Sequence, residues 1–395
     1  MDSVISSNNT FALDLFKKLS EGNSGQNIFF SPMSISSALA MVYLGAKGNT
    51  GYQMSQVLQF NQSGRTKGCF VKKRCTEASD QIHEAFQELL SDVNQPSCGY
   101  LLKTANKLFS ENNVTIVTKY LELLQKYYHA DVQAVNFLEE AENARKTINS
   151  WVEGQTEGKI QDILPSGSVD SLTRLILVNA IYFKGNWETK FPPENTEEKP
   201  FRMNKTTSKL VQMMYQRSTF KTHYIDDLET TLLELPYVNN KLSMILLLPD
   251  EIKDDSTGLE QLEKELSYKK LQEWTKAGMM VSSEVEVDLP QIHLEESYDL
   301  KATLSSMGLL DLFSAEKADL TGISDKRNIY LSQAFHKSFV EINEEGTEAA
   351  AATAGIIIVR SAPMVVRFVA DHPFLFFIRH NKTNSILFAG KFCSP

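Results

Sequence analysis

Residues 341–363 read EINEEGTEAAAATAGIIIVRSAP, and their pattern fits no ordinary core element. The stretch leaves an apolar strand at 339–342, passes through a glycine and a run of alanines, and ends with four β-branched residues before Arg360. Propensity alone favours a helix over 348–352, but that helix gives the β-branched run no role. A surface loop would leave the same run as an exposed, aggregation-prone patch. The third interpretation is a latent strand, a loop that can later enter a sheet.

The two-residue period of a β-strand tests the latent-strand interpretation, because alternate side chains face opposite sides. Counted by twos, one face would carry the uncharged residues Thr347, Ala349, Ala351, Thr353, Gly355 and Ile357. The other face opens with Glu348, the only charge between Thr347 and Val359. One face can therefore be buried without the cost of an unpaired charge. Extended, residues 346–360 would span roughly 50 Å at about 3.3 Å per residue, enough to cross a sheet from end to end.

The chain has 395 residues, with 40 Lys and Arg against 49 Asp and Glu, and a net charge of −9 with neutral histidine. This balance argues against a protein whose whole surface binds nucleic acid, since phosphate binding needs a positive field. Hydrophobic residues make up 42% of the chain, as in ordinary globular proteins. No apolar run reaches the length of a membrane span, and the first twenty residues do not resemble a signal peptide. We therefore expect a cytoplasmic protein with no membrane partner.

Motifs that carry enzyme chemistry are missing from the sequence. It contains no Walker, Gly-x-Gly-x-x-Gly, Gly-x-Ser-x-Gly or His-Glu-x-x-His motif. The four cysteines fit no zinc or redox spacing and are too few for a disulfide framework, so we expect reduced thiols. The alternative is a catalytic triad assembled from residues far apart in the sequence, which short sequence motifs do not detect. The sequence predicts a protein that is not an enzyme and holds no metal and no cofactor.

Helical periodicity is concentrated in the first part of the chain. Four-residue spacing predicts an N-terminal helix containing Phe11, Leu15 and Leu19, with Asn9 or Thr10 as its N-cap. Two further amphipathic helices are expected over 78–93 and 139–156.

Strand patterns dominate the later part. The nearly continuous apolar run at 175–183 predicts a strand covered on both faces. Residues 231–248 predict a hairpin that turns at Asn239–Asn240. Further strand-like segments lie at 57–60, 283–292, 329–342, 374–378 and 386–392. Helices first and strands later, with no Pro/Gly linker, predict a single α+β domain.

Four local patterns make the whole chain resemble the serpins. They are NIFFSP at 27–32, VNAIYFKGNW at 178–187, GTEAAAAT at 346–353 and DHPFLFFI at 371–378. The two chain ends are similar to those of the ovalbumin-type, intracellular branch, clade B. The resemblance implies one serpin domain over 1–395, with helices around a large central mixed β-sheet, further sheets, and an exposed reactive-centre loop at 344–370. It also implies a monomer that can polymerise.

In that family the exposed loop offers a bait bond to a protease. The protease cuts the bond and forms an acyl-enzyme, and the loop then inserts into the central sheet and distorts the protease, so that each inhibitor acts once. Fast insertion needs a hinge of short side chains. The hinge that the resemblance assigns is Gly346, Thr347, Glu348, Ala349, Ala350, Ala351, Ala352 and Thr353. Its residues match those of inhibitory members, so the resemblance implies inhibition.

Family spacing also implies the bait bond. The hinge glycine lies fourteen residues before the residue on the acyl side of the cut, which is Arg360 here, so the implied bond is Arg360–Ser361. Arginine suits a serine protease with an acidic specificity pocket, of trypsin type. Ile357, Ile358 and Val359 would contact the neighbouring subsites. A cut after Ile358 or Val359 would suit an elastase-like protease, and Val359 before Arg360 would suit a papain-like cysteine protease such as a cathepsin.

The resemblance also points to residues that control the opening of the sheet. Ser31, Ser34, Asn179 and His336 match the family's shutter, and Trp187 matches the aromatic residue where the loop enters. Without the resemblance, the four polar residues would be a satisfied buried cluster and Trp187 an ordinary core residue.

A second hypothesis rests on a basic segment. Five basic residues fall within 65–74, and Lys72, Lys73 and Arg74 are contiguous. We expect them in a variable interhelical loop at 61–77. There they would form either a solvated charge cluster or a nuclear-import or nucleic-acid patch. The competing function is therefore a non-inhibitory, nuclear or chromatin-associated binding protein that associates with nucleic acid. Unconventional secretion is a further alternative for location.

Overall fold

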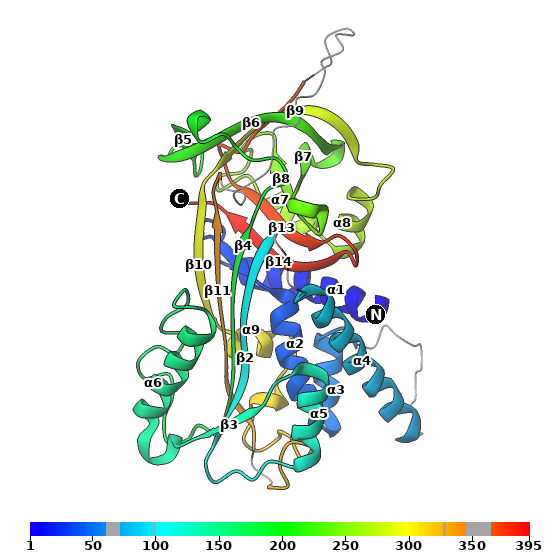
Figure 1. Ribbon diagram of the computed structural model, residues 1–395, viewed down its shortest axis with the longest axis vertical. Coiled ribbons are helices and arrows are strands. Elements are labelled where there is room, and N and C mark those ends of the chain that lie inside the picture. The colour runs from blue at the N-terminus through cyan, green and yellow to red at the C-terminus, as the bar shows by residue number, and fades with distance from the viewer. Residues whose placement is uncertain (61–71, 96, 98, 327–328, 345–364) are drawn as a thin grey trace.

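The computed structural model describes residues 1–60, 72–95, 97, 99–326, 329–344 and 365–395 (Figure 1). The helices are α1 Asp2–Ser20, α2 Pro32–Tyr43, α3 Gly48–Val57, α4 Lys72–Val93, α5 Thr118–Tyr128, α6 Phe137–Gln155, α7 Glu260–Glu265, α8 Tyr268–Trp274 and α9 Leu300–Ser306. The strands up to β7 are β1 Ile28–Phe30, β2 Tyr100–Glu111, β3 Val132–Val135, β4 Leu175–Gly185, β5 Glu197–Arg202, β6 Ser208–Ile225 and β7 Thr230–Pro236. The later strands are β8 Leu242–Pro249, β9 Val281–Pro290, β10 Ile292–Asp299, β11 Leu331–Ile342, β12 Val366–Val369, β13 Phe374–His380 and β14 Ser385–Phe392.

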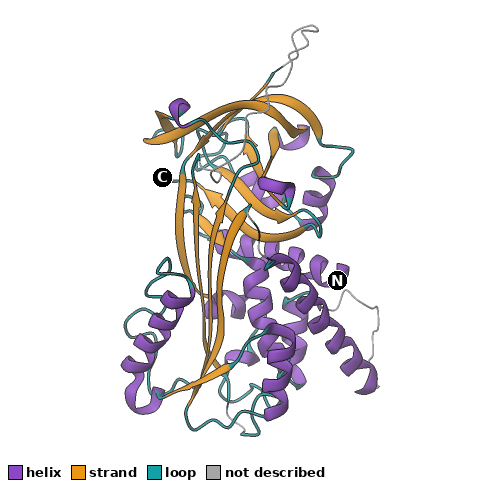
Figure 2. Cartoon of the chain, viewed as in Figure 1, coloured by secondary structure: helices purple, strands orange, loops and turns teal. Residues whose placement is uncertain are grey.

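The described strands form two sheets (Figure 2). One has the order β1-β14-β13-β8-β7-β6-β9-β12, with β5 paired to β6. The other has the order β10-β11-β4-β2-β3; its strands β10, β11, β4 and β2 run down the molecule, and the four-residue β3 lies at its edge. Parallel and antiparallel pairs are mixed with helices, which confirms the α+β class.

The five-stranded sheet is covered on both faces, as the apolar run at 175–183 predicts. Side chains alternate across β4: Val178 packs in a cluster with Ile148 of α6, whereas Leu177 packs in the cluster formed by the N-terminal helices. Figure 1 shows α6 on one side of the long strands and α2, α3 and α5 on the other. The first nine residues of β4 are buried, so the strand forms the centre of the molecule.

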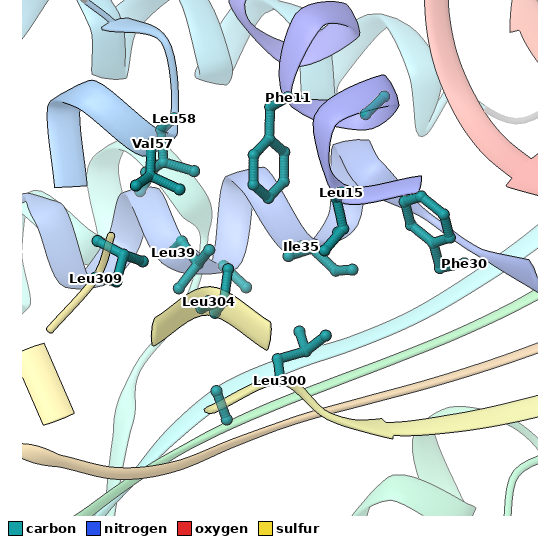
Figure 3. Close-up of a cluster of buried hydrophobic side chains, with 14 of the residues drawn as sticks. Phe11, Leu15, Phe30, Ile35, Leu39, Val57, Leu58, Leu300, Leu304 and Leu309 are labelled. Carbon is teal, nitrogen blue, oxygen red and sulfur yellow. The ribbon is translucent and has the colours of Figure 1, made fainter. Parts of the chain in front are cut away.

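The largest core cluster joins α1 to segments far away in the sequence. Phe11 and Leu15, at the predicted four-residue spacing, are fully buried. Figure 3 shows the side chains around them, from α2, the end of α3 and α9, namely Ile35, Leu39, Val57, Leu58, Leu300 and Leu304. Burial of this apolar surface, at about 25 cal/mol per Å², holds the helices against the sheet.

The predicted N-cap of the first helix is wrong. The helix begins at Asp2, and buried Val4 and Ile5 extend its apolar face. Asn9 lies inside the helix and bonds to the last strand instead: its Nδ2 donates to the Asn384 carbonyl, 2.8 Å away, and its Oδ1 accepts the Ile386 N–H at 2.8 Å. A long-range contact has replaced the local cap.

Two strand predictions also need correction. Residues 57–60 are the end of α3 and a turn, where Gln59 has a φ of 60°, so their apolar side chains serve the helical core. Residues 283–292 belong to two strands, β9 and β10, which lie in different sheets. The predicted hairpin is confirmed: β7 and β8 pair antiparallel, and Asn239 and Asn240 adopt the positive φ that its turn requires.

The predicted loop at 61–77 is too long at its C-terminal end, because α4 begins at Lys72. Residues 61–71 lie outside the described residues. Within the described residues, no helix combines the length and hydrophobicity needed to span a bilayer.

Candidate functional site

The seam between β11 and β4 is the centre of the candidate site. The two strands pair directly and in parallel, from Leu331 opposite Leu175 to Glu341 opposite Lys184. After Ile342 the chain continues through Asn343 and Glu344 and is next described at residue 365. The segment between them contains the predicted hinge at 346–353, the subsite residues 357–359 and the bond Arg360–Ser361, all of which lie outside the described residues.

The far end of the predicted loop region is partly a strand. Residues 366–369 form β12, which pairs in parallel with β9 in the larger sheet. The predicted range 344–370 is therefore too long at its C-terminal end. The chain leaves one sheet at Ile342 and enters the other at Val366, so the intervening segment joins the two sheets.

The four predicted shutter residues meet beneath this seam. Ser31 caps α2: its Oγ accepts the Ser34 N–H at 3.2 Å and donates to the Leu387 carbonyl at 2.7 Å. The Ser31 N–H donates to Nε2 of His336 at 3.2 Å. Asn179 Nδ2 donates to the Ser34 Oγ at 2.6 Å. The cluster thus ties β4 and β11 to α2 and β14.

The tautomer of His336 follows from these bonds. Its Nε2 accepts the Ser31 N–H, so the proton of the neutral ring is on Nδ1, which hydrogen-bonds Oδ1 of Asn179. Burial lowers the pKa of His336 from 6.5 to about 3, so the ring is neutral at physiological pH. The same side chains form a buried polar cluster whose members are hydrogen-bonded, so the interpretation as a buried cluster and the interpretation as a shutter agree.

Other members of the cluster escaped the sequence analysis. Asn106 on β2 accepts a hydrogen bond from Asn179 Nδ2, and the Ser338 Oγ on β11 donates to the Phe29 carbonyl at 2.7 Å. In the sequence, each of these residues is visible as a polar residue within an otherwise apolar strand. That signal does not show which residue its side chain contacts.

Trp187 lies where β11 ends. Its side chain is 3% exposed, and its Nε1 donates to the Asn343 carbonyl at 3.0 Å. Its ring stacks on Tyr237, with the centroids 4.6 Å apart and the planes within 9°. Trp187 is therefore a core residue that also holds the chain as it leaves the sheet.

Glu344, two residues beyond β11, is a second anchor that the sequence analysis missed. Its carboxylate accepts hydrogen bonds from the Thr196 hydroxyl and from Nε2 of Gln291, the latter at 2.8 and 2.9 Å. Burial opposes ionisation, but these hydrogen bonds outweigh it and hold the pKa of Glu344 below its ordinary value. Together with Trp187, this contact fixes the point from which the undescribed segment starts.

The predicted basic patch is separate from the seam. Lys72, Lys73 and Arg74 lie in the first turn of α4, not in a loop. Within the described residues there is also no group of three or more His, Cys, Asp or Glu side chains that could hold a metal ion.

Comparisons with known proteins identify the family. A family model described as "Serpin (serine protease inhibitor)" matches residues 6–395. Serpin B10 of Homo sapiens is 54% identical over 402 residues, with 100% of both chains covered. The leukocyte elastase inhibitor of Homo sapiens is 51% identical over 395 residues, again with 100% of both covered.

Solved structures show the same architecture. Uncleaved ovalbumin superposes with a TM-score of 0.88 at 38% identity, with 100% of both chains covered. A structure of maspin gives a TM-score of 0.89 at 36% identity, covering 100% of this chain and 99% of that one. The chain therefore belongs to the serpin family, has the serpin fold, and is similar to members of clade B.

Proposed function

We propose that this chain is a suicide-substrate inhibitor of trypsin-like serine proteases, cut at Arg360–Ser361. The matching family model is described as a serine protease inhibitor, and membership of this family supports a protease partner in general. One relative, 51% identical, is by name an inhibitor of leukocyte elastase. The proposal adds three points to this: the specificity for serine proteases, the position of the cut bond, and the suicide-substrate mechanism.

The direct parallel pairing of β11 with β4 carries the proposal. A segment that left β11 at Ile342 and folded back between these strands would run antiparallel to both. Insertion would exchange one parallel ladder for two antiparallel ladders, and antiparallel pairs are slightly more stable per residue. The sheet with β11 on β4 would then be the less stable arrangement, and the cut would release the energy difference.

The length of the segment supports the same mechanism. The β11 ladder on β4 runs from Leu331 to Glu341, and the uncharged alternation in the sequence runs from Thr347 to Ile357, eleven residues each. Such a strand could pair along the whole seam. Glu348 would lie near the end of the seam, close to half-buried Lys184 and Glu341, and not in its fully buried part, in keeping with the cost of burying an unpaired charge.

The test is incubation with trypsin, followed by a denaturing gel and by mass measurement of the released C-terminal peptide. We expect a complex between this chain and trypsin that stays intact on the denaturing gel, and a released peptide that begins at Ser361. Arg360→Ala should abolish both, whereas the matched variant Arg367→Ala, on β12 beyond the loop, should keep both. Thr347→Arg should convert the inhibitor into a substrate that is cut without forming a complex.

Other proteases distinguish the alternatives. If incubation with an elastase releases a peptide that begins at Val359 or Arg360, the reactive bond lies after Ile358 or Val359 instead. A stable complex with a papain-like protease would identify cysteine proteases as the target class. Full protease activity, together with an unchanged melting temperature of the cut serpin, would overturn the inhibitory proposal.

The competing proposal is a nuclear, nucleic-acid-binding role, supported by three contiguous basic residues in the first turn of α4. It predicts salt-sensitive association with DNA that is lost in Lys72→Gln/Lys73→Gln/Arg74→Gln and unaffected by Thr347→Arg. Imaging the parent and the triple variant tests the proposed location, which is cytoplasmic and nuclear.

A further inference from the structure

His372 is a buried histidine in the connection between β12 and β13, outside the β4–β11 seam. Its side chain is 4% exposed. Nε2 of the ring lies 2.6 Å from the carbonyl oxygen of Pro249, the last residue of β8. Nδ1 lies 2.8 Å from Oδ1 of Asp371. Both ring nitrogens therefore make short hydrogen bonds to oxygen atoms.

The two oxygen atoms determine the protonation of the ring. A carbonyl oxygen can only accept a hydrogen bond, so Nε2 donates to Pro249. A neutral imidazole has one donor nitrogen and one acceptor nitrogen, so its Nδ1 would direct a lone pair at the Asp371 carboxylate. Only an imidazolium, with a proton on each nitrogen, can donate to both oxygens.

A protonated Asp371 would be the alternative to a cationic ring, but its surroundings favour the ionised form. Nη2 of Arg202 lies 3.1 Å from the same Oδ1 that contacts His372. Burial opposes ionisation, but the hydrogen bonds from His372 and Arg202 outweigh it and hold the pKa of Asp371 below its ordinary value. The proton between the two side chains therefore belongs to the ring.

The other charged groups near the ring are paired with one another. Those that line a cavity of about 290 Å³ beside the ring, or pair with its lining, are Arg202, Asp250, Glu251, Glu286, Arg367 and Asp371. Arg202 lies between the carboxylates of Asp371 and Glu251, at 3.1 and 3.7 Å. Nε of Arg367 lies 3.6 Å from the carboxylate of Glu286. Because carboxylates neutralise both arginines, these cations do not exclude a third positive charge on the ring.

The bonds of His372 and Asp371 hold the end of an edge strand. β12 has four residues, and among the described strands it pairs with β9 alone. Just beyond β12, the ring of His372 is bonded to the end of β8, and the Asp371 carbonyl accepts the N–H of Arg202, at the end of β5, at 2.7 Å. Loss of the Nδ1 proton would remove one of these bonds and leave a buried ring nitrogen facing a carboxylate, which costs free energy.

We propose that His372 is a pH-sensitive anchor for β12. The doubly protonated ring holds the β12–β13 connection to β8 and to Asp371, and loss of one proton at alkaline pH loosens it. The anchor is complete below about pH 6.5, where a histidine of the unfolded chain also binds the proton, and it weakens as the pH rises. The proposal does not depend on a cut at Arg360–Ser361, so it and the inhibitory proposal can fail separately.

Nuclear magnetic resonance of the full chain, labelled with ¹⁵N at histidine alone, tests the protonation directly and needs no substitution for its readout. At pH 7.5 we expect both ring nitrogens of His372 to have the chemical shifts of protonated nitrogen. The signals are assigned as those that the His372→Gln spectrum lacks. A ring with a single N–H at pH 7.5 would refute the anchor.

The variant His372→Gln also tests the consequence for stability. Its amide can donate to Pro249 but does not titrate. The urea midpoint of the parent should exceed that of His372→Gln by the largest margin at pH 6.5, and the margin should shrink as the pH rises to 9. His129→Gln, at the exposed end of α5, is the control and should keep the parent midpoint at each pH. A margin that stays constant over this range would contradict the proposal.

Hydrogen exchange shows where the structure loosens. After correction for the intrinsic rates, the protection factors of the amides in Val366–Val369 should fall at least about tenfold between pH 6.5 and pH 9, in keeping with the loss of one hydrogen bond to a charged group. The amides of β4 should keep their protection over the same range. Unchanged protection at β12 would show that the ring does not anchor this strand.

Discussion

His336 on β11 and Asn179 on β4 are directly opposite in the parallel register, and Nδ1 of the imidazole is hydrogen-bonded to Oδ1 of the amide. This bond crosses the seam that an inserting strand would have to open. It is also buried, and its two residues connect onward to Ser31 and Ser34. The seam is therefore held by side chains as well as by the backbone ladder.

Breaking this bond should loosen the seam. Asn179→Ala leaves His336 Nδ1–H without its acceptor in a buried site, which should lower the free energy of unfolding by about 1–3 kcal/mol. Chemical denaturation measures the loss. Asn143→Ala, on the exposed side of α6, is the matched control and should change the free energy by less than about 0.5 kcal/mol. Equal effects from the two variants would show that the buried bond adds no stability.

Acid should destabilise the fold through His336. Its folded-state pKa of about 3 lies below the ordinary 6.5, so the unfolded chain binds the proton first. The stabilisation is complete above pH 6.5 and is lost as the pH falls toward 3. Urea midpoints measured from pH 7 to pH 4 should fall, and His336→Gln should reduce the slope. Buried His83, with a pKa lowered to about 4, titrates in the same direction and should account for part of the remaining slope.

Glu296 on β10 should act in the opposite direction. Burial raises its pKa from 4.5 to about 7, so the folded state binds the proton of Glu296 more tightly than the unfolded chain. The stabilisation from this protonated carboxyl is complete below pH 4.5 and is lost as the pH rises through 7. Glu296→Gln should be more stable than the parent at pH 8 by about 1–2 kcal/mol, after allowing for partial solvent exposure, and no more stable at pH 4. Thermal melts at both pH values test this. Glu295→Gln removes a carboxylate paired with Lys337 at 2.7 Å and should give no gain at pH 8.

Removing the anchor at Glu344 should free the chain where it leaves β11. Glu344→Ala deletes the acceptor for Thr196 and Gln291, and the expected cost is about 1–3 kcal/mol, because the hydrogen bonds are to a charged group. Hydrogen exchange of the β11 amides near Ile342 should rise. Glu198→Ala, at an exposed position of β5, is the control and should leave exchange at β11 unchanged.

Lys391 provides a prediction about the C-terminal strand. Its side chain is fully buried, and its Nζ lies 2.9 Å from the Glu263 carboxylate and 3.2 Å from the Asn23 carbonyl. Lys391→Met alone should cost about 3–5 kcal/mol, because it leaves a largely buried carboxylate unpaired, whereas adding Glu263→Leu should recover much of the loss. A double-mutant cycle in urea measures the coupling. Additive losses would mean that the pair is not coupled.

The elements that sequence alone determined are those with a local cause. The apolar run of β4 and the turn at Asn239–Asn240 depend on neighbours within a few residues, and both predictions are confirmed. The shutter residues came from family resemblance, and the structure brings Ser31, Ser34, Asn179 and His336 together. The assignments at 346–361 stay predictions.

Only the tertiary structure decided which residues share a site. Asn9 was predicted to cap a helix, but its amide pairs with strand β14, because burial against a distant backbone outweighs a local cap. Glu344 gained Thr196 and Gln291 as hydrogen-bond donors, through contacts between residues more than fifty positions apart. Periodicity reports which face of an element is buried, but it carries no information about which face of another element lies opposite.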